Sequence, residues 1–214
     1  MKAHRYSRPQ VAGIMLGVLC CSQAFAQFSA GIHLNEEPFR YEQTTADNRV
    51  SRLIARLETK DIVLRYTDQY GYLPDLLKSL EIPESSQGLV FSKTSMQVQH
   101  ISRLNPRAIF FNDDTHVGWI RGSSLIEISA ADPRLGAVFY TFDMLPWRVK
   151  LQRINDDCLG CHASSMTQGI PGHAVRSVFP TADGSIDVRR ESFVTNPHPR
   201  IPKSKLDRGL VTVT

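Results

Sequence analysis

The chain has 214 residues and lacks the features of several specialised protein classes. Hydrophobic residues make up 42% and charged residues 21%, with 13 glycines and 12 prolines, which excludes wholesale disorder and collagen-like structure. Four cysteines are present, and only two of them, Cys158 and Cys161, lie outside the first 26 residues; two cysteines three positions apart do not make a disulfide framework. We find no internal repeat. The composition therefore indicates an ordinary globular chain of one domain, or one domain with an extension.

Excess positive charge is confined to the N-terminus. Lys2, Arg5 and Arg8 all precede the first acidic residue, Glu36. Removing these three from the 25 basic residues leaves 22 against 21 acidic ones, so the net charge of +4 is mostly local. A nearly neutral body argues against nucleic acid as a partner.

The same N-terminus has the pattern of a secretory signal peptide. An apolar run at 11–21 follows the basic residues and precedes Ala24-Phe25-Ala26, so we expect residues 1–26 to be cleaved before Gln27. The run is shorter than the roughly 20 residues of a membrane-spanning helix, which disfavours a permanent anchor. A lipoprotein is also disfavoured, because no small residue precedes Cys20 or Cys21. We expect a periplasmic or secreted protein with no stable membrane insertion after cleavage.

The remaining chain predicts an α+β fold. Residues 27–45 are polar and aperiodic, which predicts a loose lead-in, and the domain is expected over 46–195. A helical stripe at 47–60 has Asp47 as its expected N-cap, and a second helix is expected at 74–80. Short apolar runs bounded by turn residues then predict an antiparallel β-meander, at 89–91, 108–111, 117–120, 125–128 and 137–142, with a further strand at 147–151.

The segment after the meander is rich in glycine and proline. Runs at 175–179 and 186–188 predict a hairpin around Ala182-Asp183-Gly184. Residues 196–214 form a Pro- and Lys-rich tail ending in a short apolar run, 210–214, for which we expect no partner strand. We interpret this tail as flexible or, preferably, as the truncated end of a longer protein.

Cys158-Leu159-Gly160-Cys161-His162 is a C-x-x-C-H motif, typical of covalent haem c attachment. Two thiols three residues apart reach the two vinyl groups of one haem, and the adjacent imidazole ligates the iron. Because haem c is attached outside the cytoplasm, the export signal supports the motif. We therefore predict one haem c, held by Cys158 and Cys161, with His162 as the proximal iron ligand.

Three other interpretations of the two cysteines are weaker. A zinc site needs four ligands, and only two thiols remain after signal cleavage. A thioredoxin-like dithiol has the same spacing, but no βαβ pattern surrounds it and the histidine is unexplained. A structural disulfide is the third alternative.

Part of the chain resembles bacterial exported proteins with a cytochrome c-type domain. The resemblance lies in residues 155–165 and 169–178, in Asn105-Pro-Arg-Ala-Ile-Phe-Phe-Asn-Asp-Asp114, and in Val117-Gly-Trp119 and Gly136-Ala-Val-Phe-Tyr140. It covers about Asn105 to Val194 and implies covalent haem. Members of that group continue past the end of this chain, which supports a fragment.

The sixth iron ligand is open to several predictions. Met166 is too close behind His162 to reach the opposite face of a haem. His173 follows a Gly/Pro loop and is the preferred distal ligand. The other possibilities are a vacant position and the side chains of His198, Met144, His116, Met96 and His100.

Nearby charged residues receive structural or supporting roles. Arg153 and Arg176 are candidates for neutralising haem propionates. Asp156 and Asp157 are expected to form a helix N-cap. Asp113 and Asp114 are expected in a turn between strands and not, together with His116, in a metal cluster.

The function predicted from these features is one-electron transfer with a periplasmic redox protein as partner. Whether the protein is also an enzyme stays open. The alternatives are a haem enzyme or gas sensor with an open distal position, such as a peroxidase, and a binding module in which the haem is structural.

Overall fold

The computed structural model describes residues 34–37, 39–164, 167–173, 176–190, 193–194 and 211–213. They form an α+β fold, as predicted: two short helices precede an antiparallel β-meander, and a third short helix follows it. The expected signal peptide, 1–26, lies outside the described residues. Among the residues that are described, no helix has both the length and the hydropathy needed to cross a membrane.

The first helix, α1 (Arg49–Glu58), begins one residue later than expected. Asn48 is its N-cap, and its side chain accepts hydrogen bonds from the backbone N–H groups of Val50 (3.1 Å) and Ser51 (3.0 Å). The prediction of Asp47 as N-cap was wrong. Its own N–H donates to Asp132 Oδ2 at 2.6 Å, so a tertiary contact fixes Asp47 outside the helix. Both residue types are good caps, and only that contact distinguishes them.

The second helix, α2 (Leu73–Ser79), has Pro74 in its first turn, as predicted. Proline suits this position because the first N–H groups of a helix have no partner within the helix. Leu73, Leu76 and Leu77 are buried against the sheet. Two short 3₁₀ helices, Glu84–Ser86 and Val98–His100, lie in the connections that follow.

Six strands form the meander, each antiparallel to the next. They are β1 (Gly88–Val90), β2 (Arg107–Phe111), β3 (Thr115–Trp119), β4 (Leu125–Asp132), β5 (Gly136–Asp143) and β6 (Leu151–Ile154). The strand expected at 147–151 was misplaced: residues 145–148 form a turn with a Leu145↔Arg148 bridge, and β6 begins only at Leu151.

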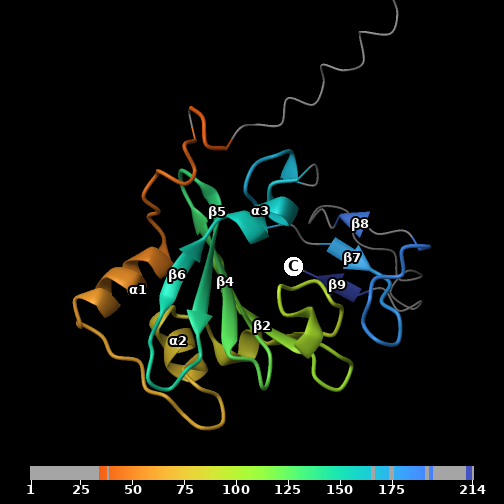
Figure 1. Cartoon of the computed structure of the whole chain (residues 1–214), viewed down its shortest axis with the longest axis horizontal. Coiled ribbons are helices and arrows are strands. Elements are labelled where there is room, and N and C mark those ends of the chain that lie inside the picture. Colours follow the sequence, from red (N-terminus) through yellow and green to blue (C-terminus); the bar gives the residue numbers. More distant parts are fainter. Residues whose placement is uncertain are drawn as a thin grey trace, which may run out of the picture. The chain divides into compact units, whose positions relative to one another are not determined.

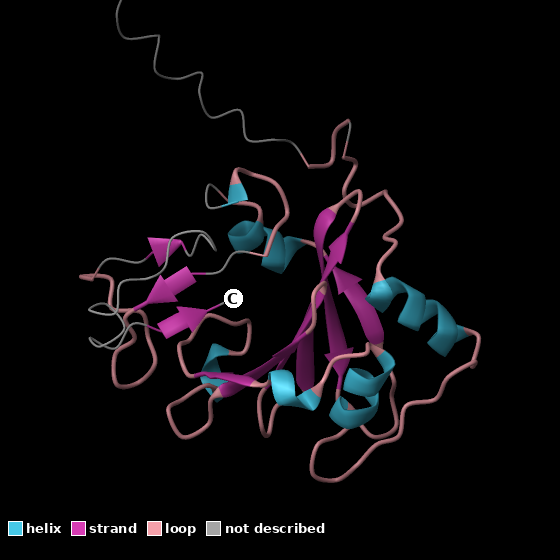
Figure 2. Cartoon of the chain, turned by 180° about the vertical axis from the view of Figure 1, so that it is seen from behind, coloured by secondary structure: helices cyan, strands magenta, loops and turns pink. Residues whose placement is uncertain are grey.

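Helices α1 and α2 lie on one face of this sheet, and α3 (Asp156–His162) lies on the other (Figures 1 and 2). Successive residues of a strand point to opposite faces. The main hydrophobic core is on the α1–α2 face and takes alternate residues of the strands, among them Val117, Ile126, Ile128, Val138 and Phe142. The intervening residues face α3.

The segment before α1 packs against the sheet. Tyr41 is fully buried and donates from its hydroxyl to the backbone oxygen of Ala137 at 2.7 Å. Arg153 donates to the backbone oxygens of Thr44 (2.9 Å) and Tyr41 (2.6 Å). The prediction of a loose lead-in was therefore wrong for these residues, because one buried tyrosine suffices to fix a polar, aperiodic segment.

A second, three-stranded sheet has the order β8–β7–β9. Its strands are β7 (Arg176–Val178), β8 (Phe193–Val194) and β9 (Val211–Val213). The predicted hairpin is only a single Pro180↔Ile186 bridge. The expectation that the C-terminal run lacks a partner strand was also wrong, since β9 pairs with β7. This pairing joins residues more than thirty positions apart, which local patterns do not reveal.

Candidate haem site

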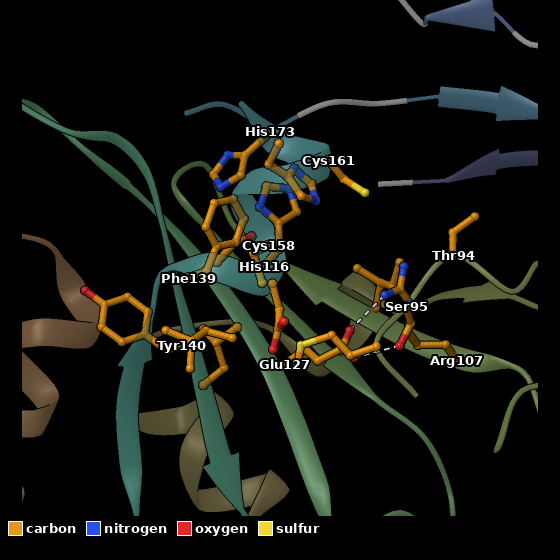
Figure 3. A pocket seen from close by; sticks show the side chains of 18 of the residues that line it. Thr94, Ser95, Arg107, His116, Glu127, Phe139, Tyr140, Cys158, Cys161 and His173 are labelled. Atoms are coloured by element: carbon orange, nitrogen blue, oxygen red, sulfur yellow. Dashed lines mark hydrogen bonds and ion pairs between the residues drawn. The ribbon is translucent and has the colours of Figure 1, made fainter. Parts of the chain in front are cut away.

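A cavity of about 490 Å³ lies between the sheet and α3 and is lined by both cysteines of the motif. The sheet contributes Arg107, Ile109, His116, Gly118, Glu127, Ser129, Phe139 and Ile154; α3 contributes Asp157, Cys158, Cys161 and His162; the rest includes Lys93, Thr94, Ser95, Met96, His173 and Ile186. Figure 3 shows the cysteines and His173 near α3, with Thr94, Ser95 and Arg107 at the other end.

Strand register explains how the sheet forms a hollow floor here. His116 pairs with Ser129, Ser129 with Phe139, and Gly118 with Glu127, so these side chains share the face opposite the main core. Gly118 has no side chain and Ser129 has a small one. Because the side chains in the middle of this face are short, they leave the space between the sheet and α3 unfilled.

Helix α3 places the two motif cysteines on one side. Residues three apart are neighbours on a helix surface, and Cys158 (half-buried) and Cys161 (exposed) both line the cavity as free thiols. Burial, with the nearby carboxylates of Glu127 and Asp157, raises the pKa of Cys158 to about 12. The expected capping role of the two aspartates was wrong, because α3 already begins at Asp156 and its N-cap is Asn155.

His162 is held by one hydrogen bond that decides its tautomer. Its Nδ1 lies 3.0 Å from the carbonyl oxygen of Gly172. A carbonyl only accepts, so Nδ1 carries the proton and Nε2 of the neutral ring keeps its lone pair. Burial lowers the pKa of His162, which favours that neutral form. The ring of Phe139 lies 4.8 Å from the imidazole, centre to centre.

The loop that supplies this carbonyl is itself tied to the sheet. Gly172 N donates to the backbone oxygen of His162 at 2.9 Å, and Pro171 accepts from Ala137 N, also at 2.9 Å. Gly136 begins β5 with φ of +75°, and a Cβ there would overlap the Pro171 oxygen. Glycine is needed at this position both for its backbone conformation and for the close approach.

His173 lies beside a second histidine that the cavity brings close. The rings of His173 and His116 meet edge to face, with centres 4.7 Å apart. Each has a buried nitrogen without a hydrogen-bond partner among the described residues: Nε2 of His173 and Nδ1 of His116. Burial, with His116 and His162 nearby, lowers the pKa of His173 to about 4. The structure therefore gathers three imidazoles at one end of the cavity.

The other expected iron ligands are dispersed. Met96 lines the cavity, whereas Met144 belongs to the main core and His100 is exposed at the end of a 3₁₀ helix. His198 and Met166 lie outside the described residues.

The charged residues also differ in position. Arg153 stacks on Tyr41, with its guanidinium carbon 4.6 Å from the ring centre, and does not line the cavity. The side chain of Arg176 lies outside the description. Asp113 and Asp114 occupy the β2–β3 turn, as predicted, and Asp114 pairs with Arg49 at 2.9 Å.

Sequence analysis missed a polar cluster that lines the cavity from the sheet and from the connection after β1. Arg107 Nη1 lies 3.1 Å from Glu127 Oε2, and only 7% of the arginine side chain is exposed. Glu127 Oε1 also accepts from Ser95 Oγ at 2.7 Å and from Gln97 Nε2 at 3.3 Å. The sequence contained a signal for this residue. Glu127 lies between Ile126 and Ile128 in an expected strand, and alternation along the strand places it on the face opposite the core.

The motif therefore places two thiols, of Cys158 and Cys161, and the neutral imidazole of His162 around the cavity. No group of three or more His, Cys, Asp or Glu side chains within the described ranges is arranged to hold a metal ion. Comparison with known proteins found no matching family model, no matching curated protein and no matching solved structure. The functional argument therefore depends on this chain's own residues.

Proposed function

We propose that this chain is an exported haem c protein that transfers single electrons, similar to bacterial proteins with a cytochrome c-type domain. Cys158 and Cys161 would bind the haem covalently and His162 would ligate its iron through Nε2. The observation that carries this proposal is the 3.0 Å contact from His162 Nδ1 to the Gly172 carbonyl, beside two free thiols on one cavity. Iron-binding histidines characteristically donate their other ring N–H to such an acceptor.

The cavity suits a prosthetic group better than the competing uses of a C-x-x-C pair. Its volume of about 490 Å³ falls within the roughly 300–1,000 Å³ of small-molecule and cofactor sites. A redox dithiol requires a cysteine with lowered pKa, whereas the pKa of Cys158 is raised. A zinc site requires four ligands, and no suitable group of them surrounds these thiols in the described part.

The chain's own residues have distinct tasks in this proposal. When bound, haem supplies the one-electron chemistry. Cys158 and Cys161 tether it from one helix turn. Gly172 holds His162 in a single tautomer, and Phe139 packs against its ring. The sheet and α3 would supply the side chains that contact the group.

The sixth ligand separates this proposal from its enzyme alternative. The Gly172 carbonyl is on the Nδ1 side of His162, away from the nitrogen that would bind iron. His173 is the next residue, so it reaches the opposite face of a haem only if the loop 167–173 changes course. The prediction of His173 as distal ligand stays a prediction. This position of Gly172 favours, as the second candidate, a haem enzyme or gas sensor with an open distal site.

Two measurements on the mature protein test the proposal. Produced with the cytochrome c maturation machinery, it should retain haem after acid–acetone extraction and give a pyridine haemochrome spectrum of one haem. Haem that washes out would overturn the proposal. Carbon monoxide added to the reduced protein should leave the spectrum of an electron carrier unchanged, whereas binding would promote the enzyme or sensor.

The sixth ligand has its own test. If His173 ligates the iron, His173→Ala should convert a low-spin spectrum to high spin while covalent haem remains. An unchanged spectrum would remove His173 and direct attention to Met96 and His116, which also line the cavity. A wild-type protein that is already high-spin would favour the open site.

We also propose a periplasmic or secreted location, with a redox protein as partner. The N-terminal pattern supports this location, and the periplasmic product should begin at or near Gln27. Recovery of the intact N-terminus on a membrane-bound product would identify residues 1–26 as an anchor instead.

A further inference from the structure

The end of the cavity away from α3 carries hydrogen-bond donors that the haem attachment does not use. Lys93, Thr94 and Ser95 line it from the connection after β1, and Arg107 lines it from β2 (Figure 3 labels the last three). This end contains cations, hydroxyl groups and the Glu127 carboxylate that pairs with Arg107, whereas the end near α3 contains thiols and imidazoles.

Two hydroxyl groups of this connection have no hydrogen-bond partner among the described residues. They are Ser92 Oγ and Thr94 Oγ1, and both oxygens are buried. A buried hydroxyl without a partner loses its hydrogen bonds to water without replacing them, so such groups in a native structure call for an explanation. Thr94 lines the cavity, which makes a bound acceptor the simplest explanation for its orphaned hydroxyl.

Lys93 is positioned by its backbone, while its side chain is only weakly engaged. Lys93 N donates to the carbonyl oxygen of Gly184 at 2.7 Å. The ammonium group lies 3.3 Å from Asp183, whose side chain is 62% exposed. Such a solvent-screened pair contributes little to stability, so the ammonium can exchange Asp183 for an acceptor in the cavity at small cost.

Arg107 and Glu127 fix the geometry of this end. The two opposite charges of this ion pair neutralise each other. Glu127 also accepts hydrogen bonds from Ser95 and Gln97, and these bonds hold the connection between β1 and β2 against the sheet. Gln97 in turn accepts from Ser123. The donors of residues 93–95 are therefore preorganised, and Lys93 supplies the charge that is not cancelled inside the cavity.

We propose that Lys93, Thr94 and Arg107 form a cradle for carboxylates. Carboxylates accept several hydrogen bonds at once and favour ammonium and guanidinium donors. One source is the haem itself, and in that case the inference rests on the proposed function: the propionates occupy a different edge of the ring from the vinyl groups that the cysteines bind. The other source is a small free carboxylate that enters beside the haem.

Thr94→Val is the sharpest variant, because it keeps the shape and removes only the orphaned hydroxyl. In the unloaded protein it should not lower the thermal midpoint. In the haem-loaded protein Thr94→Val and Lys93→Gln should each lower the reduction potential, because donors to the anionic edge are lost. Lys78→Gln is the matched control: it makes the same charge change at an exposed position of α2 and should leave the potential nearly unchanged.

Titration with acetate distinguishes the two sources. If the propionates occupy the cradle, acetate leaves the Soret band of the loaded protein unchanged while the variants shift the potential. If the cradle is free, acetate shifts the Soret band, and Lys93→Gln and Thr94→Val weaken its binding at least tenfold. Loaded variants with wild-type potential and no acetate response would overturn the cradle while leaving covalent haem intact.

The cradle can also be tested if haem fails to attach. Acetate should then shift the amide resonances of residues 93–95 in the unloaded protein, and Lys93→Gln should abolish those shifts. Absence of any such shift would overturn the cradle independently of the proposed function.

Discussion

The two faces of the six-stranded sheet are built from the same strands and differ in almost every other respect. Toward α1 and α2, alternate residues such as Val117, Ile126 and Phe142 are fully buried in one continuous core. Toward α3, the intervening residues include Arg107, His116, Gly118 and Glu127 around a cavity of about 490 Å³. One face stabilises the fold by burying apolar surface.

The other face gives up part of that stabilisation. Glycine and serine in the middle of it leave space, and three side chains that line it, those of Thr94, His116 and His173, each have a buried polar atom without a partner in the described part. Buried polar groups without partners lower the stability of the fold. The two faces therefore differ in how fully the space beside the sheet is filled by side chains.

The largest effect should come from the motif on the cavity face. Cys158→Ala with Cys161→Ala should abolish covalent haem completely, because both thioethers are lost. Acid–acetone extraction followed by intact-mass measurement checks this. Ser129→Ala, in the same cavity, should retain haem. Haem that stays attached to the double cysteine variant would contradict the proposal.

On the core face, Phe142→Ala should destabilise the fold by about 3–5 kcal/mol, because it leaves a cavity among packed side chains. Phe111, on the other face, is 46% exposed. Phe111→Ala should therefore cost only about 0.5 kcal/mol. Urea denaturation of the two variants measures both values, and equal losses would contradict the distinction between the faces.

Glu127→Ala should cost about 3 kcal/mol, since it leaves the buried Arg107 without its carboxylate. The double variant Arg107→Met with Glu127→Leu should recover most of this lost stability, because it removes the buried guanidinium together with the carboxylate. Denaturation of the two variants tests this. A double variant no more stable than Glu127→Ala would show that the pair supports the fold in another way.

Asp132 links α1 to the turn before β5. Burial alone would raise the pKa of Asp132, but hydrogen bonds from the N–H groups of Arg134, Asp47 and Leu135 and from the Asn48 side chain lower it below its ordinary value of 3.8. Its stabilising effect is therefore complete above that value and is lost as pH falls through the folded-state pKa.

Asp132→Asn should cost about 1.5–3 kcal/mol at pH 7, as expected for hydrogen bonds to a charged group. The difference from wild type should shrink at strongly acidic pH, where the wild-type carboxyl is protonated. Thermal denaturation over a pH series measures this trend. A difference that does not change with pH would mean that the charge is unimportant.

The smallest effect is expected at the C-terminus. Removing residues 197–214 takes away β9, which pairs with β7 through three residues. Global stability should change by about 0.5 kcal/mol or less, but amide exchange in β7 should accelerate. A fall of several degrees in the thermal midpoint would show that the tail contributes to the main core.

The parts of this fold predicted from sequence are those that depend on local periodicity. The stripe of α1, Pro74 in α2 and the turn-bounded runs of the meander located most elements, and the C-x-x-C-H spacing located the cysteines and His162 in one helix turn. The parts that were missed depend on non-local contacts. Examples are the pairing of β9 with β7 and the burial of Tyr41 in a polar segment.

The cavity was missed for the same reason. Arg107, His116 and Glu127 lie on three different strands, and only the register of the folded sheet brings them together. Each looks unremarkable in the sequence. Their shared position on the alternate face was recoverable in principle, once the meander had been inferred.

The turn at Gly136 connects the sheet to the chemistry of His162. Gly136 admits the Pro171 carbonyl, Pro171 fixes Gly172, and Gly172 holds the imidazole. A side chain at position 136 would displace Pro171 and Gly172, and would weaken the hydrogen bond that orients His162, the histidine that is proposed to bind iron. The site therefore depends on more than its five-residue motif: a change 26 positions upstream of His162, in a residue that touches neither thiol nor imidazole, would alter the orientation of the imidazole that is proposed to bind iron.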